Sequence, residues 1–116
     1  MHVEEFNFAS DDHQIRGILY VMSDSCLIWL SLCDELPEFH NLSVTFPSHL
    51  GPISSEIYGT SDTSSMIGRH ISNKLKVPCF VSLELNEDLF HIVPMLQQEL
   101  FDRLSCHFNQ TDLISV

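Results

Sequence analysis

Basic residues are scarce in this sequence, and their scarcity excludes two classes of partner. The chain of 116 residues has 5 lysines and arginines against 16 aspartates and glutamates, a formal net charge of −11 with histidine neutral. Such a chain repels phosphate backbones and anionic lipid, so we expect neither nucleic acid nor membrane as a partner. The acidic residues are scattered, which is typical of a solvated surface and also allows steering toward a basic protein partner.

Long apolar segments are also missing. No run approaches the roughly 18 apolar residues of a transmembrane helix. The segment from Met1 to Ser10 is acidic and has no apolar core, so it does not resemble a secretory signal. These features predict a cytoplasmic location, with the nucleus left open, and cysteines that stay reduced.

The sequence lacks the spacings that carry metal or catalytic chemistry. Its four cysteines form no C-x-x-C pair, and Cys26 and Cys79 lie inside apolar runs, as small buried residues do. Its seven histidines form neither H-x-x-x-H nor H-E-x-x-H, and no G-x-S-x-G elbow or phosphate loop occurs. We therefore expect a protein that is not an enzyme, with no catalytic residue, no cofactor and no metal site.

Alternating apolar residues between turn-forming segments predict about six strands. The run from Cys26 to Leu32 is apolar on both faces, so we expect a central strand that is covered on both sides, with Trp29 in the core. Ser23-Asp24-Ser25 precedes this run and is typical of a β-hairpin turn. The predicted strands are Val3–Ala9, Ile18–Met22, Cys26–Leu32, Leu42–Phe46, Ser54–Tyr58 and Val77–Leu85.

A first helix is predicted where the apolar period changes from two to about 3.6. Ile67, Ile71 and Leu75 share one face of this helix, which we expect to begin near residue 61 or 62. Hydroxyl and carboxylate groups at its start can accept hydrogen bonds from the N–H groups of the first turn. The residues predicted to form this structural cap are Ser61, Asp62 and Thr63.

A second apolar stripe predicts a closing helix from Leu89 to about Leu104. Pro94 either starts the regular part of this helix or bends it, because proline removes a backbone donor. The tail 109–116 has no clear period, and we expect it to be poorly ordered. The order of elements, β-β-β-β-(β)-α-β-α, predicts a single α+β domain over residues 1–116 with two main helices.

Several short segments, taken in order, resemble the proteasome assembly chaperone 4 family. The most specific are Asp24-Ser25 before the strand that carries Trp29, and the Thr-Ser-Asp-Thr start of the first helix. The resemblance covers roughly residues 6 to 104. The segments that carry it are Asn7-Phe8, Asp24-Ser25, Leu27-Ile28-Trp29, Asn41-Leu42-Ser43-Val44, Gly59 with Thr60-Ser61-Asp62-Thr63, and Val77 through Phe80-Val81-Ser82.

The resemblance implies a fold, a function and two partners. It implies a β-sandwich-like domain, which agrees with the antiparallel strands expected from the order of elements, and a non-enzymatic assembly chaperone. Such a protein pairs with proteasome assembly chaperone 3 as a heterodimer and holds the alpha-5 subunit while the alpha ring of the 20S proteasome is built. The alternative is a dimeric α+β adaptor or scaffold module for another cytosolic complex, because one fold hosts many functions.

One strand face is a candidate for binding these partners. Phe80 shares a face with Ser82 and Glu84, and an aromatic side chain on an otherwise polar face can anchor an interface. The alternative is that a helix covers this face and buries Phe80. We predict Phe80, Ser82 and Glu84 as partner-binding residues.

Overall fold

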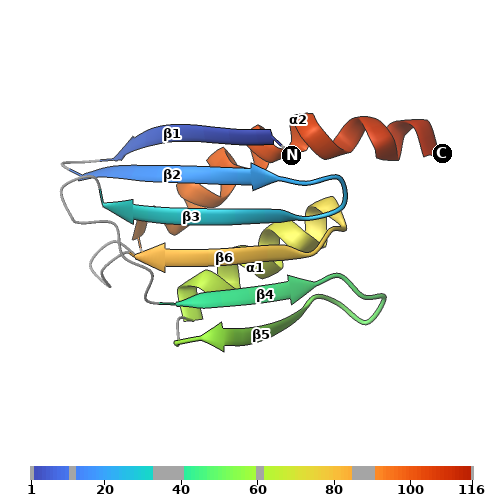
Figure 1. Ribbon diagram of the computed structural model, residues 1–116, viewed down its shortest axis with the longest axis horizontal. Helices are drawn as coiled ribbons and strands as arrows, with labels where there is room; N and C mark the ends of the chain where they lie inside the picture. Colours follow the sequence, from blue (N-terminus) through green and yellow to red (C-terminus); the bar gives the residue numbers. More distant parts are fainter. Residues whose placement is uncertain (1, 11–12, 33–40, 60–61, 85–90, 116) are drawn as a thin grey trace.

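The structure, a computed structural model, describes residues 2–10, 13–32, 41–59, 62–84 and 91–115. This part contains one sheet of six strands and two helices, which lie together behind the sheet in Figure 1. The predicted α+β class, strand number and order of elements are confirmed. The elements are β1 (His2–Ser10), β2 (His13–Val21), β3 (Cys26–Leu32), β4 (Leu42–Phe46), β5 (Ile53–Tyr58), α1 (Asp62–Leu75), β6 (Cys79–Glu84) and α2 (Val93–Ser115).

The sheet is mixed, in the order β1-β2-β3-β6-β4-β5, because β3 and β6 at its centre run parallel. The other pairs of described strands are antiparallel. After β5, helix α1 returns the chain to the end of the sheet at which β5 began. The next strand, β6, therefore runs parallel to β5, and it also runs parallel to its neighbour β3. The expected antiparallel, sandwich-like arrangement is thus corrected to one mixed sheet with helices on one face, since a helical crossover permits a parallel neighbour.

The predicted hairpin and the apolar stripe of α1 are confirmed, and so is the stripe of α2 from Val93 onward, whereas Leu89 lies outside the described residues. Between β2 and β3, the Met22 backbone N–H donates to the Ser25 carbonyl at 2.9 Å and closes the turn. The core lies between the helices and the face of the sheet that carries Cys79, Val81 and Leu83. The helix residues in this core are Ile67, Ile71 and Leu75 from α1 and Val93, Leu96, Leu100, Leu104 and Phe108 from α2.

The first helix approaches the sheet closely at Gly68. A Cβ atom on this residue would lie 2.8 Å from Oγ1 of Thr45 and 3.4 Å from Cγ2 of Val81. The backbone of α1 therefore packs directly against β4 and β6, and a side chain at position 68 would push the helix away from the sheet.

The closing helix begins at Val93, after a single 3₁₀ turn at residues 91–92. Pro94 therefore occupies the first turn, where the backbone N–H has no intrahelical acceptor and proline is tolerated. Of the two alternatives for Pro94, the structure supports the one in which Pro94 starts the regular part of the helix and does not bend it. The helix continues through residues 109–115, and the expected poor order of the tail stays a prediction. Neither helix is long and apolar enough to cross a membrane within the described residues.

Asn41 joins the start of β4 to the end of β6. Its side-chain amide donates from Nδ2 to the Leu83 carbonyl at 2.7 Å, and its Oδ1 accepts from the Leu83 N–H at 3.1 Å. Both bonds are buried, and they lie beyond Ser43 and Val81, the last backbone pair on this side of the β4–β6 register. The asparagine side chain thus takes the place of another pair of strand residues.

We expect Asn41→Ala to lower the free energy of unfolding by roughly 2–3 kcal/mol, because it leaves a buried N–H and a buried carbonyl unpaired. Urea unfolding followed by the fluorescence of Trp29, the single tryptophan, measures this change. Asn73→Ala is the matched control, since Asn73 is exposed on α1. Equal unfolding midpoints for the two variants would contradict the assigned role of Asn41.

Candidate functional site

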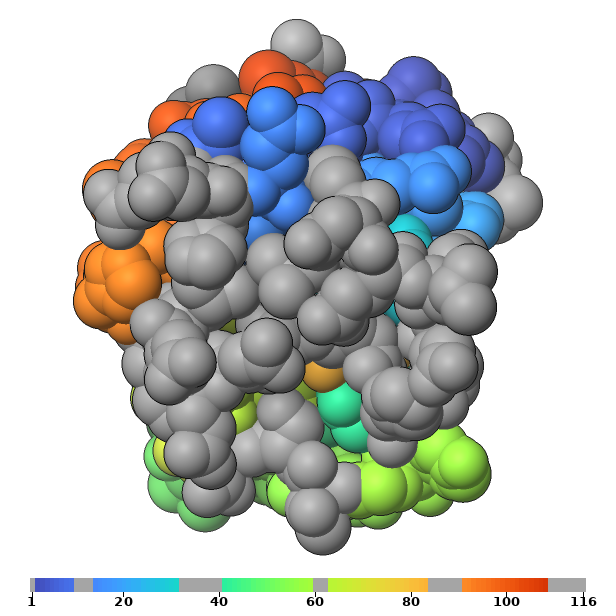
Figure 2. Space-filling model, turned by 90° about the vertical axis from the view of Figure 1, so that its left-hand side faces the viewer, coloured from blue at the N-terminus to red at the C-terminus, as the bar shows by residue number. Residues whose placement is uncertain are grey.

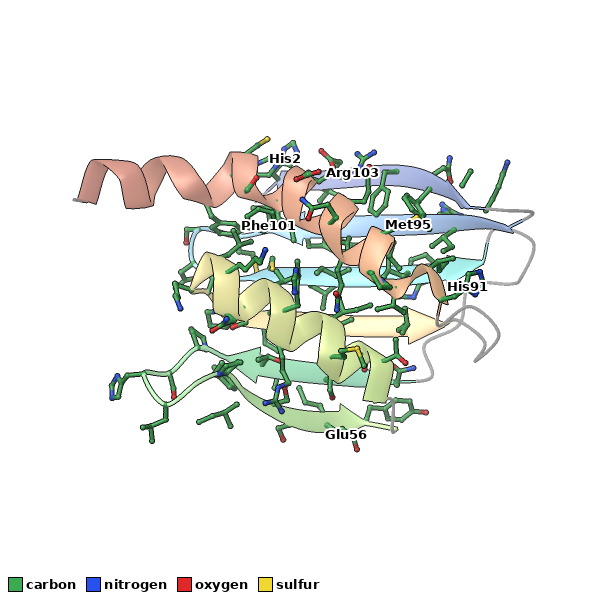
Figure 3. All side chains as sticks on the ribbon, turned by 180° about the vertical axis from the view of Figure 1, so that it is seen from behind. His2, Glu56, His91, Met95, Phe101 and Arg103 are labelled. Atoms are coloured by element: carbon green, nitrogen blue, oxygen red, sulfur yellow. The ribbon has the colours of Figure 1, made fainter. Side chains whose placement is uncertain are left out.

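The face of the sheet opposite the helices is the candidate functional site, and we call it the open face. Both described helices pack on the other side, as Figures 1 and 3 show from the two directions. In the end-on view of Figure 2, α2 lies to the left of the blue strands, away from the open face. The apolar residues of the open face include Val3, Ile18, Tyr20, Leu27, Trp29, Val44, Phe46, Ile53 and Phe80.

An apolar row crosses the open face at the level of Phe80. In the strand register, Tyr20 lies opposite Leu27, Leu27 opposite Phe80, and Phe80 opposite Val44. Residues directly opposite each other have side chains on the same face, with Cβ atoms about 5 Å apart. Tyr20, Leu27 and Phe80 are half-buried and Val44 is buried, so the accessible part of the row spans β2, β3 and β6.

A second row places a desolvated hydroxyl beside the tryptophan. Ile18 lies opposite Trp29, and Trp29 lies opposite Ser82 on β6. Ser82 is 0% exposed, and its Oγ has no hydrogen-bond partner in the described part of the chain. A buried hydroxyl without a partner is costly, which makes Ser82 unusual among the buried serines.

The apolar surface continues to one edge of the sheet and meets charged residues at the other. On the β5 side, Phe46 and Ile53 lie opposite each other and are 49% and 59% exposed. On the β1 side, the guanidinium of Arg16 and the carboxylate of Glu5 form an ion pair of 2.7 Å between exposed side chains. Such a pair contributes little to stability, but it gives the apolar surface a charged rim.

The structure brings Phe80 and Ser82 together on the open face, as predicted, but it changes the character of that face. Phe80 lies near the middle of the apolar row rather than alone among polar residues, and no described helix covers it. Glu84 is the last residue of β6, and its side chain lies outside the described residues. That these three residues bind a partner stays a prediction.

The expected burial of Trp29 in the core is wrong. Trp29 is half-buried on the open face, and it is not part of the cluster of buried core residues. Both faces of β3 are apolar, a pattern that predicts a strand covered on both sides, whereas the described helices cover only one face. The same signal in β2, where Ile18 and Tyr20 alternate with the buried Ile15, Leu19 and Val21, could have identified the open face.

The predicted cap lies at the start of α1, away from the open face. Asp62 is the first residue of α1, in agreement with the predicted start, and Thr63 is buried. Ser61 and the side chain of Asp62 lie outside the described residues. The capping role of the three residues therefore stays a prediction.

The groups with perturbed pKa values are dispersed over different elements. A hydrogen bond from Cys26 and complete burial raise the pKa of Cys79 inside the core. Burial and the nearby ammonium of Lys74 lower the pKa of His70 on α1. Burial lowers the pKa of Arg103 on α2, but hydrogen bonds to Glu4 and Glu99 outweigh burial and raise it. Among the described residues these groups form no common site, so their shifts reflect local packing.

Comparison with known proteins gives a family match and a structural match. The sequence model of a family described as proteasome assembly chaperone 4 matches residues 14–85, from β2 to the end of β6. No curated protein sequence matches the chain. Eleven chains of solved structures match, and one belongs to a crystal structure of a chaperone complex for yeast 20S proteasome assembly. That chain is 15% identical, with a TM-score of 0.71 over 93% of this chain and 99% of the yeast chain, which shows a shared fold.

We expect Ser82→Ala to raise the free energy of unfolding of the isolated chain by about 1 kcal/mol, because it removes a buried hydroxyl that has no partner. Ser72→Ala is the matched contrast: Ser72 is also fully buried, but its Oγ donates to the Val77 carbonyl at 2.8 Å. Ser72→Ala should lower the same free energy by roughly 1–2 kcal/mol. If urea unfolding shows equal destabilisation by both substitutions, Ser82 has a partner after all.

Proposed function

The chain belongs to the proteasome assembly chaperone 4 family, a non-catalytic family involved in 20S proteasome assembly, and on this premise we propose that it pairs with proteasome assembly chaperone 3 through its open face. The heterodimer then holds the alpha-5 subunit while the alpha ring is built. We place this activity in the cytoplasm, with the nucleus left open. The observation that carries the proposal is the half-buried apolar row from Tyr20 to Phe80, which no described helix covers.

The open face has the composition of a protein interface. Aromatic residues are enriched at the centres of interfaces, and Tyr20, Trp29 and Phe80 lie within two neighbouring rows. The Arg16–Glu5 pair lies at the β1 edge, where a polar rim is expected. A partner sheet or helix that packs on these rows would remove their half-exposed side chains from water and gain about 25 cal/mol for each Å² of apolar surface.

Ser82 lies below the surface that a partner would contact. Its Oγ is fully buried in the isolated chain, so it does not reach a partner directly. Its proposed contribution to pairing is therefore to support Trp29, which lies opposite it in the strand register and is half-buried.

The chain has room for both partners. Its accessible surface is 6766 Å², and a specific interface takes about 800 Å² from each protein. Two interfaces would therefore use about a quarter of the surface, which leaves the alpha-5 subunit a surface of its own. The net charge of −11 favours association with a surface that carries basic residues.

We expect Phe80→Ser to weaken pairing with proteasome assembly chaperone 3 by more than tenfold, because it removes an aromatic anchor from the centre of the apolar row. Met66→Ser is the control, since Met66 is an exposed apolar residue of α1, on the helix side of the sheet. Size-exclusion chromatography with light scattering measures the molar mass of each mixture, and circular dichroism checks that both variants fold.

The same experiment tests the function when the alpha-5 subunit is added. The wild-type chain should form a 1:1 pair with the chaperone 3 partner, and the pair should take up alpha-5 as a ternary complex. Equal pairing by the two variants would contradict the use of the open face. The absence of any pairing and uptake by the wild-type chain at micromolar concentration would contradict the proposed function and favour the adaptor or scaffold alternative.

A further inference from the structure

The two ends of the chain bring three potential metal ligands together on the helix side of the sheet. His2 and Glu4 are two residues apart in β1, so their side chains share the face toward the helices. His107 lies one turn after Arg103 on α2, and the guanidinium of Arg103 binds Glu4. Figure 3 shows His2 and Arg103 beside each other where α2 passes β1.

The distances are compatible with one shared ion. The ligand atoms of His2, Glu4 and His107 all lie within 4.8 Å of one another, and the two imidazole rings have centroids 4.6 Å apart at an angle of 38°. Ligand atoms around a tetrahedral Zn²⁺ are about 3.4 Å apart, given metal–nitrogen bonds of about 2.1 Å. Both histidines are exposed, so small side-chain rotations can close the difference without moving the core.

We infer that His2, Glu4 and His107 form a binding site for a divalent transition-metal ion of the Zn²⁺ class. Two imidazole nitrogens and one carboxylate oxygen are a common ligand set for such ions, with water at the fourth position. Mg²⁺ and Ca²⁺ prefer oxygen ligands alone, so they should not compete. The sequence offered no signal for this site, because its two histidines lie at opposite ends of the chain.

Arg103 fixes the position of one of the three proposed ligands, Glu4. Its Nη1 binds Oε2 of Glu4 at 3.2 Å, its Nε binds Glu99 at 2.8 Å, and its guanidinium lies 4.4 Å from the centre of the Phe6 ring. These contacts hold the Glu4 carboxylate in place beside the imidazoles, as outer-shell groups do for metal ligands. The positive charge of Arg103 opposes the ion, whereas the net charge of −11 attracts it.

A bound ion would link the edge strand β1 to α2. In the described residues the ion pair of Arg103 with Glu4 already links β1 to α2. The metal ion would add a second link through His107, one helical turn after Arg103. The site lies on the side of the sheet opposite the open face, so ion binding and the pairing proposed above are separable.

Calorimetric titration of the full chain with Zn²⁺ tests the site. We expect one ion per chain, a rise in the thermal unfolding midpoint that saturates with Zn²⁺, and no effect of Mg²⁺. His107→Ala and His2→Ala should each weaken binding by at least tenfold. Because both side chains are exposed, these variants should fold, and His107→Gln repeats the test with a side chain of similar size.

Two control variants make the ligand assignment specific. His49→Ala removes an exposed histidine outside the cluster, and Cys106→Ser removes the exposed thiol next to His107, so both should bind Zn²⁺ like the wild type. The site is overturned by no binding at about 100 µM Zn²⁺, by unchanged binding in His107→Ala, or by one ion shared between two chains. Loss of binding in Cys106→Ser would also overturn it.

Discussion

The parallel pairing of β3 with β6 is the constraint on which the rest of this structure depends. It joins the antiparallel unit β1-β2-β3 to the unit β4-β5, and it forces the chain to cross over through α1 before β6 can enter. The close approach at Gly68 then holds α1 against β4 and β6, while α2 covers the remaining part of the same face. Both helices of the described residues therefore pack on one side of the sheet, and neither of them covers the open face.

The open face follows from this distribution of helices and matches the composition of the central strands. β2 and β3 carry apolar residues on both faces, although the described helices bury only one. For an isolated protein, half-exposed Tyr20, Trp29 and Phe80 are a liability, because exposed apolar patches promote association. For an assembly chaperone, the same surface lets the chain remain folded alone and still gain binding energy from a partner.

Local sequence patterns predicted the local structure, but they did not predict which distant segments pair with each other. The hairpin between β2 and β3, the start of α1 and the stripe Ile67-Ile71-Leu75 rest on neighbouring residues, and all three are confirmed. The order of short motifs along the chain identified the family. The parallel β3–β6 pair, the exposure of Trp29 and the meeting of His2 with His107 depend on which distant segments become neighbours, and periodicity contains no such information.

The central position of β6 also has a consequence for how the chain folds as it is synthesised. β3 is complete at residue 32, but its parallel neighbour ends at residue 84 and the helix that covers β1 and β2 begins only at residue 93. A nascent chain on the ribosome therefore cannot complete its core until nearly the whole sequence has emerged. Contacts between residues so far apart also slow folding, so the apolar surfaces of β2 and β3 stay exposed to water until α2 docks.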